Sequence, residues 1–168
     1  AFSWDFGDGS PAAPGADAVH IFPAGGFVVV LTATDSGNPP QQTRAPALQV
    51  RADPPLSATA GVTPVSGPRP LTVTYSAQAT GGLPPHSFTW SSTDGSPVQT
   101  GASPVHTYNA AGSFTATLAV TDSAEHPQNT AVQAPPVTVT EQLSASATAA
   151  PLAGPSPLTV ACEGSASG

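Results

Sequence analysis

The sequence predicts an all-β protein built from small antiparallel sandwiches, and three features of its pattern carry that prediction. Apolar and polar residues alternate with a period of two in segments such as Leu71 to Ala77, as in strands with one buried face. Turn-forming Gly and Pro contribute 16 and 21 of the 168 residues and separate the alternating segments. No segment shows the i, i+3, i+4 spacing of apolar residues that an amphipathic helix requires.

An internal repeat of 86 to 87 residues organises the chain. The separation grows from 86 to 87 because one residue is inserted before the long apolar segment of the second repeat. Self-similarity at a fixed period indicates repeated structural units. The matched segments, each followed by its later counterpart, are residues 4 and 90, 8–11 and 94–97, 19–22 and 105–108, 34–36 and 121–123, and 67–73 and 154–160.

Strands are expected where the alternation runs between turn signals. In the second repeat they are expected at residues 71–77, at Phe88 and Trp90, at 106–108, at 114–120, and from Val132 to Val139. The last of these is interrupted by proline, which implies an edge strand or a bulge because proline cannot donate to the ladder. About seven short strands per repeat, with a Trp on an early central strand, fit an immunoglobulin-like sandwich.

One stretch of the first repeat carries a family signature. Residues 4–10 read Trp-Asp-Phe-Gly-Asp-Gly-Ser, and residues 19–22 read Val-His-Ile-Phe. This pattern resembles the PKD (polycystic kidney disease) domain, in which Trp-Asp-Phe-Gly-Asp-Gly and a later His-x-Tyr are the most recognisable signatures. The second repeat departs at Ser91 and Ser92 but keeps His-Thr-Tyr at residues 106–108. The resemblance implies tandem immunoglobulin-like sandwiches of extracellular and cell-surface proteins, which act as spacers or interaction modules and not as catalysts.

Aligned on the repeat, the chain divides into one complete and two partial domains. Residues 53–140 are expected to form the complete domain, residues 1–52 a domain that lacks its first two strands, and residues 141–168 two opening strands only. A sandwich without two strands exposes apolar surface and unpaired edges. We therefore expect residues 141–168 of one chain to complete residues 1–52 of the next by strand donation. A window on a longer covalent array of domains explains the same ends equally well.

The expected assembly interface follows from the alternation of inward and outward side chains. Residue Cys162 aligns with Tyr75 and is expected to behave as a small buried hydrophobe rather than as a reactive thiol. Asp substitutions at Leu158 and Val160 are expected to abolish assembly. The acceptor residues are Phe2, Trp4, Phe27, Val29 and Leu31, and the donor residues are Leu143, Ala145, Leu158, Val160 and Cys162.

The carboxylates Asp5 and Asp8 suggest a calcium site, because hard cations prefer clustered oxygen ligands. A turn is the better interpretation, since Asp side chains bond local backbone amides in turns. The second repeat has Ser91 in place of Asp5, and no further acidic residues crowd nearby. We therefore expect no metal ion here, although a structural ion in one of the two repeats stays open. Asp35 and Asp122 each end a long strand before a Ser and are expected to cap the turn that follows.

Two other residue types recur at equivalent positions. His20 and His106 each precede an aromatic residue by two positions, and we expect each imidazole to bond the backbone or to pack across the sheet. Trp4 and Trp90 could stack on sugars, but their place on an inner strand favours core packing. Carbohydrate binding is thus weakly supported, although a carbohydrate or protein ligand stays open.

Charge and cysteine content exclude several classes of function. The chain has 3 Lys+Arg against 10 Asp+Glu and a net charge of -7, so no basic surface is available for nucleic acid or anionic membranes. No stretch is apolar enough for membrane insertion. A single Cys allows no internal disulfide, and no metal-type Cys/His spacing occurs. We expect no catalytic residues, no cofactor and no enzymatic activity, because no acid/base constellation is present.

Taken together, these features lead to an expectation about function. We expect an extracellular or cell-surface structural subunit of a filament or stalk, assembled head to tail from PKD-like domains by strand donation. Its partners would be further molecules of the same chain or neighbouring PKD-like domains. The alternative is a spacer or binding accessory module of a larger secreted hydrolase or cell-surface adhesin. A catalytic neighbour in the parent protein would favour that alternative.

Overall fold

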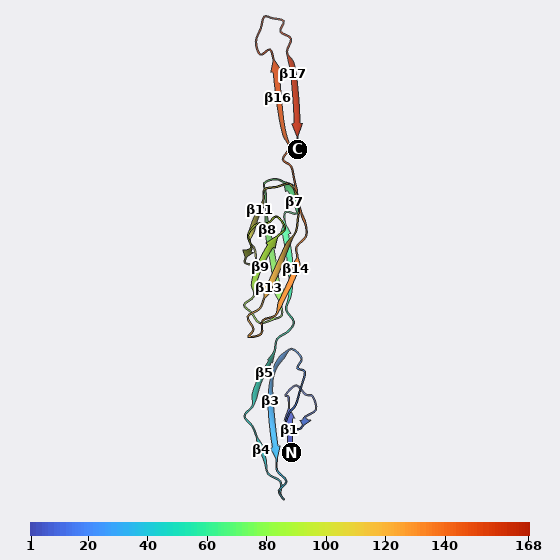
Figure 1. Cartoon of the computed structure of the whole chain (residues 1–168), viewed down its shortest axis with the longest axis vertical. Helices are drawn as coiled ribbons and strands as arrows, with labels where there is room; N and C mark the ends of the chain where they lie inside the picture. Colours follow the sequence, from blue (N-terminus) through green and yellow to red (C-terminus); the bar gives the residue numbers. More distant parts are fainter. The chain divides into compact units, whose positions relative to one another are not determined.

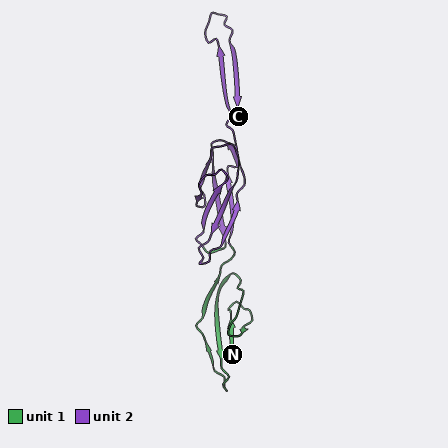
Figure 2. Cartoon of the chain, viewed as in Figure 1, with its two compact units in different colours: residues 1–55, 81–83 green, residues 56–80, 84–168 purple.

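The computed structural model describes all 168 residues and contains strands, turns and loops but no helix (Figure 1). It divides into two compact units (Figure 2). The first unit comprises residues 1–55 and 81–83, and the second comprises residues 56–80 and 84–168. The all-β prediction is therefore confirmed. No helix is available that could cross a lipid bilayer.

The first unit is a five-stranded antiparallel sheet centred on one long strand. The first half of this strand pairs with β5, and its second half pairs with β1 and β4, while β2 pairs with β1. Residues 27–31 of this strand are all apolar, and within this run Val29 is buried while Val28 is exposed, so the two faces of the sheet differ in burial. The strands are β1 (Phe2–Asp5), β2 (Ala13–Pro14), β3 (Gly25–Thr34), β4 (Gln42–Arg44) and β5 (Leu48–Ala52).

The second unit contains a sandwich of three small sheets. Their strand orders are β11-β8-β6, β10-β9-β13-β14 and β12-β15-β7, and only the pair β15 and β7 is parallel. The strands are β6 (Ser57–Thr63), β7 (Ser66–Pro68), β8 (Leu71–Thr80), β9 (Ser87–Ser92), β10 (Gln99–Thr100), β11 (Val105–Tyr108), β12 (Gly112–Phe114), β13 (Ala116–Thr121), β14 (Asn129–Gln133) and β15 (Val137–Thr140).

The core of the sandwich is built from alternate residues of these strands. Along β8, Leu71, Val73 and Tyr75 are buried while the residues between them are exposed, as the alternation predicted. Trp90 from β9 and Leu118 from β13 face them and are fully buried. Because all three sheets contribute to one contiguous cluster, the sandwich has the layered core that an immunoglobulin-like fold requires.

Two segments that are each predicted as one strand are divided between two sheets in the structure. Residues 114–120 are divided between β12 and β13, which belong to different sheets. The predicted strand from Val132 to Val139 is likewise divided between β14 and β15. Pro135 and Pro136 lie at this second break. Since proline has no N–H to continue a ladder, the chain leaves one sheet there and enters the other, so the prediction of a single interrupted strand is wrong.

The second unit also contains a separate two-stranded hairpin, formed by β16 (Ser144–Ala150) and β17 (Ala161–Ser167). Nearly all of its residues are exposed, because the sheet has only these two strands. Cys162 is a free, exposed thiol. The prediction that this cysteine is buried is therefore wrong within the chain, since no second sheet covers its face of the hairpin.

Candidate assembly site

The strand pairs of the first unit have the same register as those of the sandwich. Trp4 lies opposite Leu31, and their counterparts in the repeat, Trp90 and Leu118, also lie opposite each other. β5 pairs with β3 as β15 pairs with β12, again with equivalent partners. Since register decides which face each side chain occupies, the two regions can be compared residue by residue.

The first unit differs in having no counterparts of β6 and β8. In the sandwich, residues 105–108 form β11 because they pair with β8. The equivalent residues 19–22 form no strand. Trp4 and Leu31 are only half-buried, whereas their counterparts Trp90 and Leu118 are buried. The apolar face of β1, β3 and β5 is therefore uncovered where β8 covers its equivalent in the sandwich.

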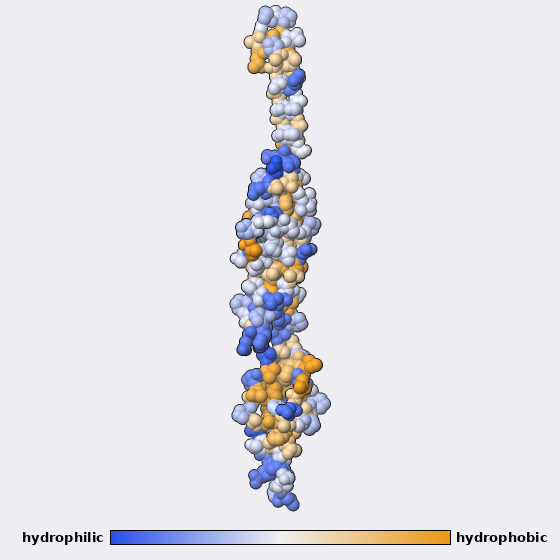
Figure 3. Space-filling view, viewed as in Figure 1, coloured by the Kyte–Doolittle hydropathy of each residue, from blue (hydrophilic) through white to orange (hydrophobic).

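This uncovered face forms a groove of about 360 Å³. Figure 3 shows apolar side chains gathered over the part of the chain that holds β1, β3 and β5. Of its lining residues, Phe6 and Val29 are buried, whereas Leu48 remains 55% exposed. We call this surface the open groove; it is lined by Trp4, Phe6, Ala18, Val19, His20, Phe22, Val29, Leu48 and Val50.

The two tryptophans show what β8 adds. Trp90 stacks on Tyr75 of β8 with ring centroids 4.7 Å apart and is 1% exposed. Trp4 is only half-buried. In both repeats the indole nitrogen donates a hydrogen bond of 3.1 Å to a backbone carbonyl, that of Gly15 or Gly101. Core packing is thus confirmed for Trp90, and Trp4 is held in an equivalent position with one face open.

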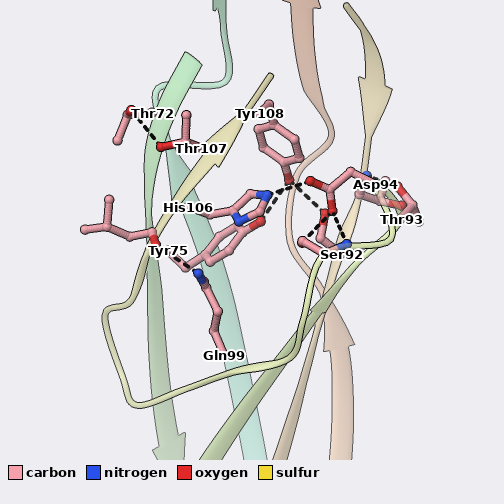
Figure 4. Close-up of polar contacts among 12 residues, drawn as sticks. Thr72, Tyr75, Ser92, Thr93, Asp94, Gln99, His106, Thr107 and Tyr108 are labelled. Atoms are coloured by element: carbon pink, nitrogen blue, oxygen red, sulfur yellow. Dashed lines mark hydrogen bonds and ion pairs between the residues drawn. The ribbon is translucent and has the colours of Figure 1, made fainter. Parts of the chain in front are cut away.

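A buried histidine binds an aspartate in the sandwich (Figure 4). Nε2 of His106 lies 2.8 Å from Oδ2 of Asp94, whose other carboxylate oxygen accepts hydrogen bonds from Ser96. Burial opposes ionisation of Asp94, but the hydrogen bonds from Ser96 and His106 outweigh it and lower the pKa of this carboxyl to about 2. The contact ties the turn after β9 to β11.

The same contact occurs in the first unit. Nε2 of His20 lies 2.6 Å from Oδ2 of Asp8. Hydrogen bonds from Ser10 and His20 lower the pKa of Asp8 well below its usual range. Each imidazole was predicted to bond the backbone or to pack across the sheet. The hydrogen-bond partner is instead an aspartate side chain, and the ring of Phe6 stacks on His20 with centroids 4.0 Å apart. The sequence signal was present: Asp, Ser and His recur together at the repeat spacing.

A cluster of hydroxyl groups links the sheet of β8 and β11 to the facing sheet that contains β9 (Figure 4). The hydroxyls of Tyr75 and Tyr108 share a hydrogen bond of 2.8 Å, and Oγ of Ser92 lies 3.2 Å from the Tyr108 hydroxyl. Burial and the hydrogen bond with Tyr108 raise the pKa of Tyr75 well above its ordinary value. In the first unit the counterparts of Tyr108 and Ser92 are Phe22 and Phe6, so this cluster has no equivalent there.

Only some of the predicted acceptor residues line the open groove. Trp4 and Val29 do so. Phe2, Phe27 and Leu31 lie at alternate positions of the same strands, and hence on the same face, but outside the lining of the groove. The prediction omitted the other lining residues, which the repeat could have identified through their counterparts in the second repeat. These are Phe6, Ala18, Val19, His20, Phe22, Leu48 and Val50.

All five predicted donor residues are exposed. Their counterparts in β6 and β8, by contrast, belong to the core of the sandwich or pack against it. Ala145 and Cys162 lie in the hairpin strands, at positions equivalent to inward positions of β6 and β8, whereas Leu143, Leu158 and Val160 lie just before these strands. Each donor residue and its counterpart are Leu143 and Leu56, Ala145 and Ala58, Leu158 and Leu71, Val160 and Val73, and Cys162 and Tyr75.

Other carboxylates serve turns, as predicted. Oδ1 of Asp5 accepts a hydrogen bond from the backbone N–H of Gly7 at 3.0 Å. Oδ1 of Asp35 accepts from the N–H groups of Gln41 and Gly37, which lower the pKa of this carboxyl. Asp122 makes the equivalent contacts in the sandwich. No group of three or more His, Cys, Asp or Glu side chains is placed to hold a metal ion.

Comparison with known proteins identifies the family. The sequence model of the PKD domain matches residues 52–147. A solved structure described as "Structure of amphioxus IgVJ-C2 molecule" is 16% identical, with 79% of this chain and 86% of that chain covered and a TM-score of 0.39. No curated protein matches the sequence. Because the family match spans more than half of the 168 residues, the chain belongs to the PKD domain family.

Proposed function

We propose that the chain is an extracellular structural module whose open groove is completed by the β16–β17 hairpin of another molecule of the same chain. The contact is head to tail, so its repetition builds a filament unless a ring closes. In this proposal the chain acts by strand pairing and burial and performs no chemical step. The observation that carries it is the match between the hairpin and the strand pair that the groove lacks.

The register of the hairpin supports this proposal. Ser144 lies opposite Ser167, and Ser57 lies opposite Thr80, in each case with both partners displaced by 87 residues. The hairpin therefore presents its side chains as β6 and β8 present theirs. Gly154 approaches Leu158 as closely as Gly67 approaches Leu71, so this contact is shared, whereas residues 158–160 form no strand and their counterparts belong to β8.

A polar contact also has its counterpart. In the sandwich the backbone N–H of Leu56, just before β6, donates a hydrogen bond of 2.8 Å to Oε1 of Gln128. The equivalent residues are Leu143, just before β16, and Gln41 of the first unit. Both residue types are unchanged, so a docked hairpin can repeat this bond.

Burial of apolar side chains supplies the driving force. Leu158 and Val160 are each 40% exposed, whereas Leu71 and Val73, their counterparts, are 8% and 1% exposed. Burial of a Leu or Val side chain contributes about 1.5–3 kcal/mol relative to full exposure. The groove and the hairpin each expose apolar surface that the other can cover, a pairing typical of strand addition to an open sheet.

The extracellular assignment rests on the family and the composition. PKD domains are typical of extracellular and cell-surface proteins, and this one belongs to the family over residues 52–147. The chain has only 3 Lys+Arg in 168 residues. Because trypsin-like proteases cleave after Lys and Arg, it offers them few sites. This composition suits a surface module that is exposed to proteolysis.

The mass of the full chain in solution tests the proposal. Light scattering after size exclusion is expected to give species larger than 16.5 kDa, with a mass that rises with concentration. Leu158→Asp with Val160→Asp should leave a monomer, because two carboxylates would enter the apolar groove. A matched control, Thr159→Asp with Ala161→Asp, adds the same charge on the opposite face and should still assemble.

Two outcomes would contradict strand donation. Assembly of the Leu158→Asp, Val160→Asp variant as strong as that of the unchanged chain would rule out the hairpin as donor. A chain that stays monomeric at every concentration would favour the alternative function, a spacer module whose groove is completed by a neighbouring domain of a longer protein.

A further inference from the structure

We propose that the open groove selects its partner: it accepts a hairpin with an apolar residue at the Cys162 position and rejects one with tyrosine there. This inference rests on the proposed function, because it presumes that a β16–β17 hairpin docks in the groove. It goes further in naming the residues that distinguish this hairpin from the β6–β8 strand pair. Those residues are Cys162 on the donor side and Phe22 and Phe6 on the acceptor side.

The sandwich shows what a tyrosine at this position requires. The hydroxyl of Tyr75 is buried with its ring, which is 1% exposed, and it bonds the hydroxyl of Tyr108 at 2.8 Å. Ser92 supports the same cluster from the facing sheet. A buried hydroxyl without a partner is costly because its hydrogen bonds to water are lost and not replaced.

The open groove has lost these partners. Phe22 stands at the position of Tyr108, and Phe6 stands at that of Ser92. Their rings pack on other aromatic rings: Phe22 packs on Phe27 at 5.1 Å, and Phe6 stacks on His20 at 4.0 Å. The His20 Nε2 atom is held by Asp8. A tyrosine docked here would therefore meet aromatic carbon where Tyr75 meets hydroxyl groups.

The hairpin carries the matching change. Cys162 stands at the position of Tyr75 and is an apolar side chain that needs no hydrogen bond. The exchange is also reciprocal in size. The sandwich combines a large donor-side ring with the small Ser92, whereas the hairpin and groove combine the small Cys162 with the ring of Phe6.

A second position changes in the same paired way. In the sandwich, Nε of Arg69 lies 2.6 Å from Oε2 of Glu141. The hairpin has Ser156 at the position of Arg69, and the first unit has Pro54 at that of Glu141. Both members of the ion pair are thus absent together. Matched changes on two separate contacts indicate that the groove and this hairpin form a specific pair.

The test compares two substitutions that differ by a single oxygen atom. Cys162→Phe and Cys162→Tyr introduce the same ring into the exposed hairpin, and each is combined with Phe6→Ala so that the groove has room for a ring. The concentration at half assembly is measured for each full chain by light scattering. We expect the Tyr variant to need about ten-fold more protein than the Phe variant. Introducing Phe22→Tyr into both chains should reduce this ratio to about two-fold or less, because the added hydroxyl restores a partner.

Controls separate the two proposals. Ser165→Tyr places the same ring on the outward face of β17 and should leave assembly unchanged. In the unchanged chain, the Cys162 thiol should react with maleimide more slowly as assembly proceeds. Equal assembly of the Phe and Tyr variants, in a chain that does assemble, would overturn the selection rule alone. A chain that never assembles and whose thiol stays reactive would overturn strand donation together with it.

Discussion

The first unit and the sandwich have the same strand pairs but different burial. Leu118 lies opposite Trp90 and is fully buried, while Leu31 lies opposite Trp4 and is only half-buried. The pairing of β1 with β3 therefore does not need the sheet that contains β8, whereas burial does. Antiparallel pairing is set by contacts between neighbouring strands, and burial is set by the layer that packs on them.

The difference extends to local structure at the edge of the missing layer. Residues 105–108 are a strand only because β8 provides a hydrogen-bonding partner. Residues 19–22 have a closely related sequence but no such partner, and they form no strand. The contact of His20 with Asp8 still holds this segment against the turn that follows β1. Side-chain contacts thus keep the segment in place where the ladder is absent.

The largest expected effect is a difference between equivalent leucines. Leu118→Ala should destabilise the sandwich by about 2–5 kcal/mol, because it leaves a cavity in a closed core. Leu31→Ala should destabilise the first unit by less than half as much, because water already reaches its surroundings. Amide hydrogen exchange of peptides from β13 and β3, measured in dilute protein, reports each unit separately. Equal losses of protection would contradict the difference in burial.

Acid should weaken the sandwich through Asp94. The pKa of this carboxyl is 3.8 when unperturbed and about 2 in the folded chain, so the ionised form is favoured by folding. Its contribution is complete above about pH 4 and is lost as pH falls toward 2. Melting temperatures measured across this range should fall less steeply in Asp94→Asn. An unchanged slope would show that other carboxyl groups cause the acid sensitivity.

Removing the hydroxyls of Tyr75 and Tyr108 should leave the sandwich, like the open groove, with aromatic rings but no hydroxyl pair at this position. Tyr75→Phe and Tyr108→Phe should each lower the free energy of unfolding by about 1 kcal/mol, because each removes the tyrosine partner of the other hydroxyl. The double variant should lose less than the sum of the two, since neither hydroxyl is then left unpaired. Urea unfolding of the four chains measures this coupling. Strict additivity would mean that the 2.8 Å contact contributes nothing.

The smallest expected effect concerns the exposed ion pair. Arg69 and Glu141 have side chains 48% and 49% exposed, so Glu141→Gln should lower the free energy of unfolding by under about 1 kcal/mol. This loss of stability should vanish at high salt, which screens exposed charges. Urea unfolding at low and high ionic strength measures it. A larger loss that persists in salt would indicate that the pair also positions the segment before β8.

Much of the fold was predictable because it depends on local pattern. The alternation at residues 71–77 correctly predicted the buried face of β8. The signature around Trp4 correctly indicated the family. The break at Thr115 was missed, and the interruption at residues 134–136 was predicted as an edge strand or a bulge and not as a change of sheet, because alternation continues across a point where the chain changes sheet. Periodicity reports which residues face inward but not which strand lies beside them.

The candidate site was predictable only in part. Trp4 and Val29, which alternation within their strands selects, do line the open groove. Phe6, His20 and Phe22 were missed because they follow or lie outside these strands, in segments whose position depends on the contact between His20 and Asp8. Their repeat counterparts, read together, would have identified them.

By itself, the sequence determined the strands, the inward faces, the repeat and the family, since each of these depends on residues close together or on spacing along the chain. Only the tertiary structure decided which side chains meet: His106 binds Asp94, and Tyr75 binds Tyr108. Cys162, at the position of Tyr75 in the repeat, is exposed instead. The physical reason is that burial and hydrogen bonding require a partner in space. The same apolar position is core in the sandwich and open surface in the hairpin because only the sandwich has a second layer.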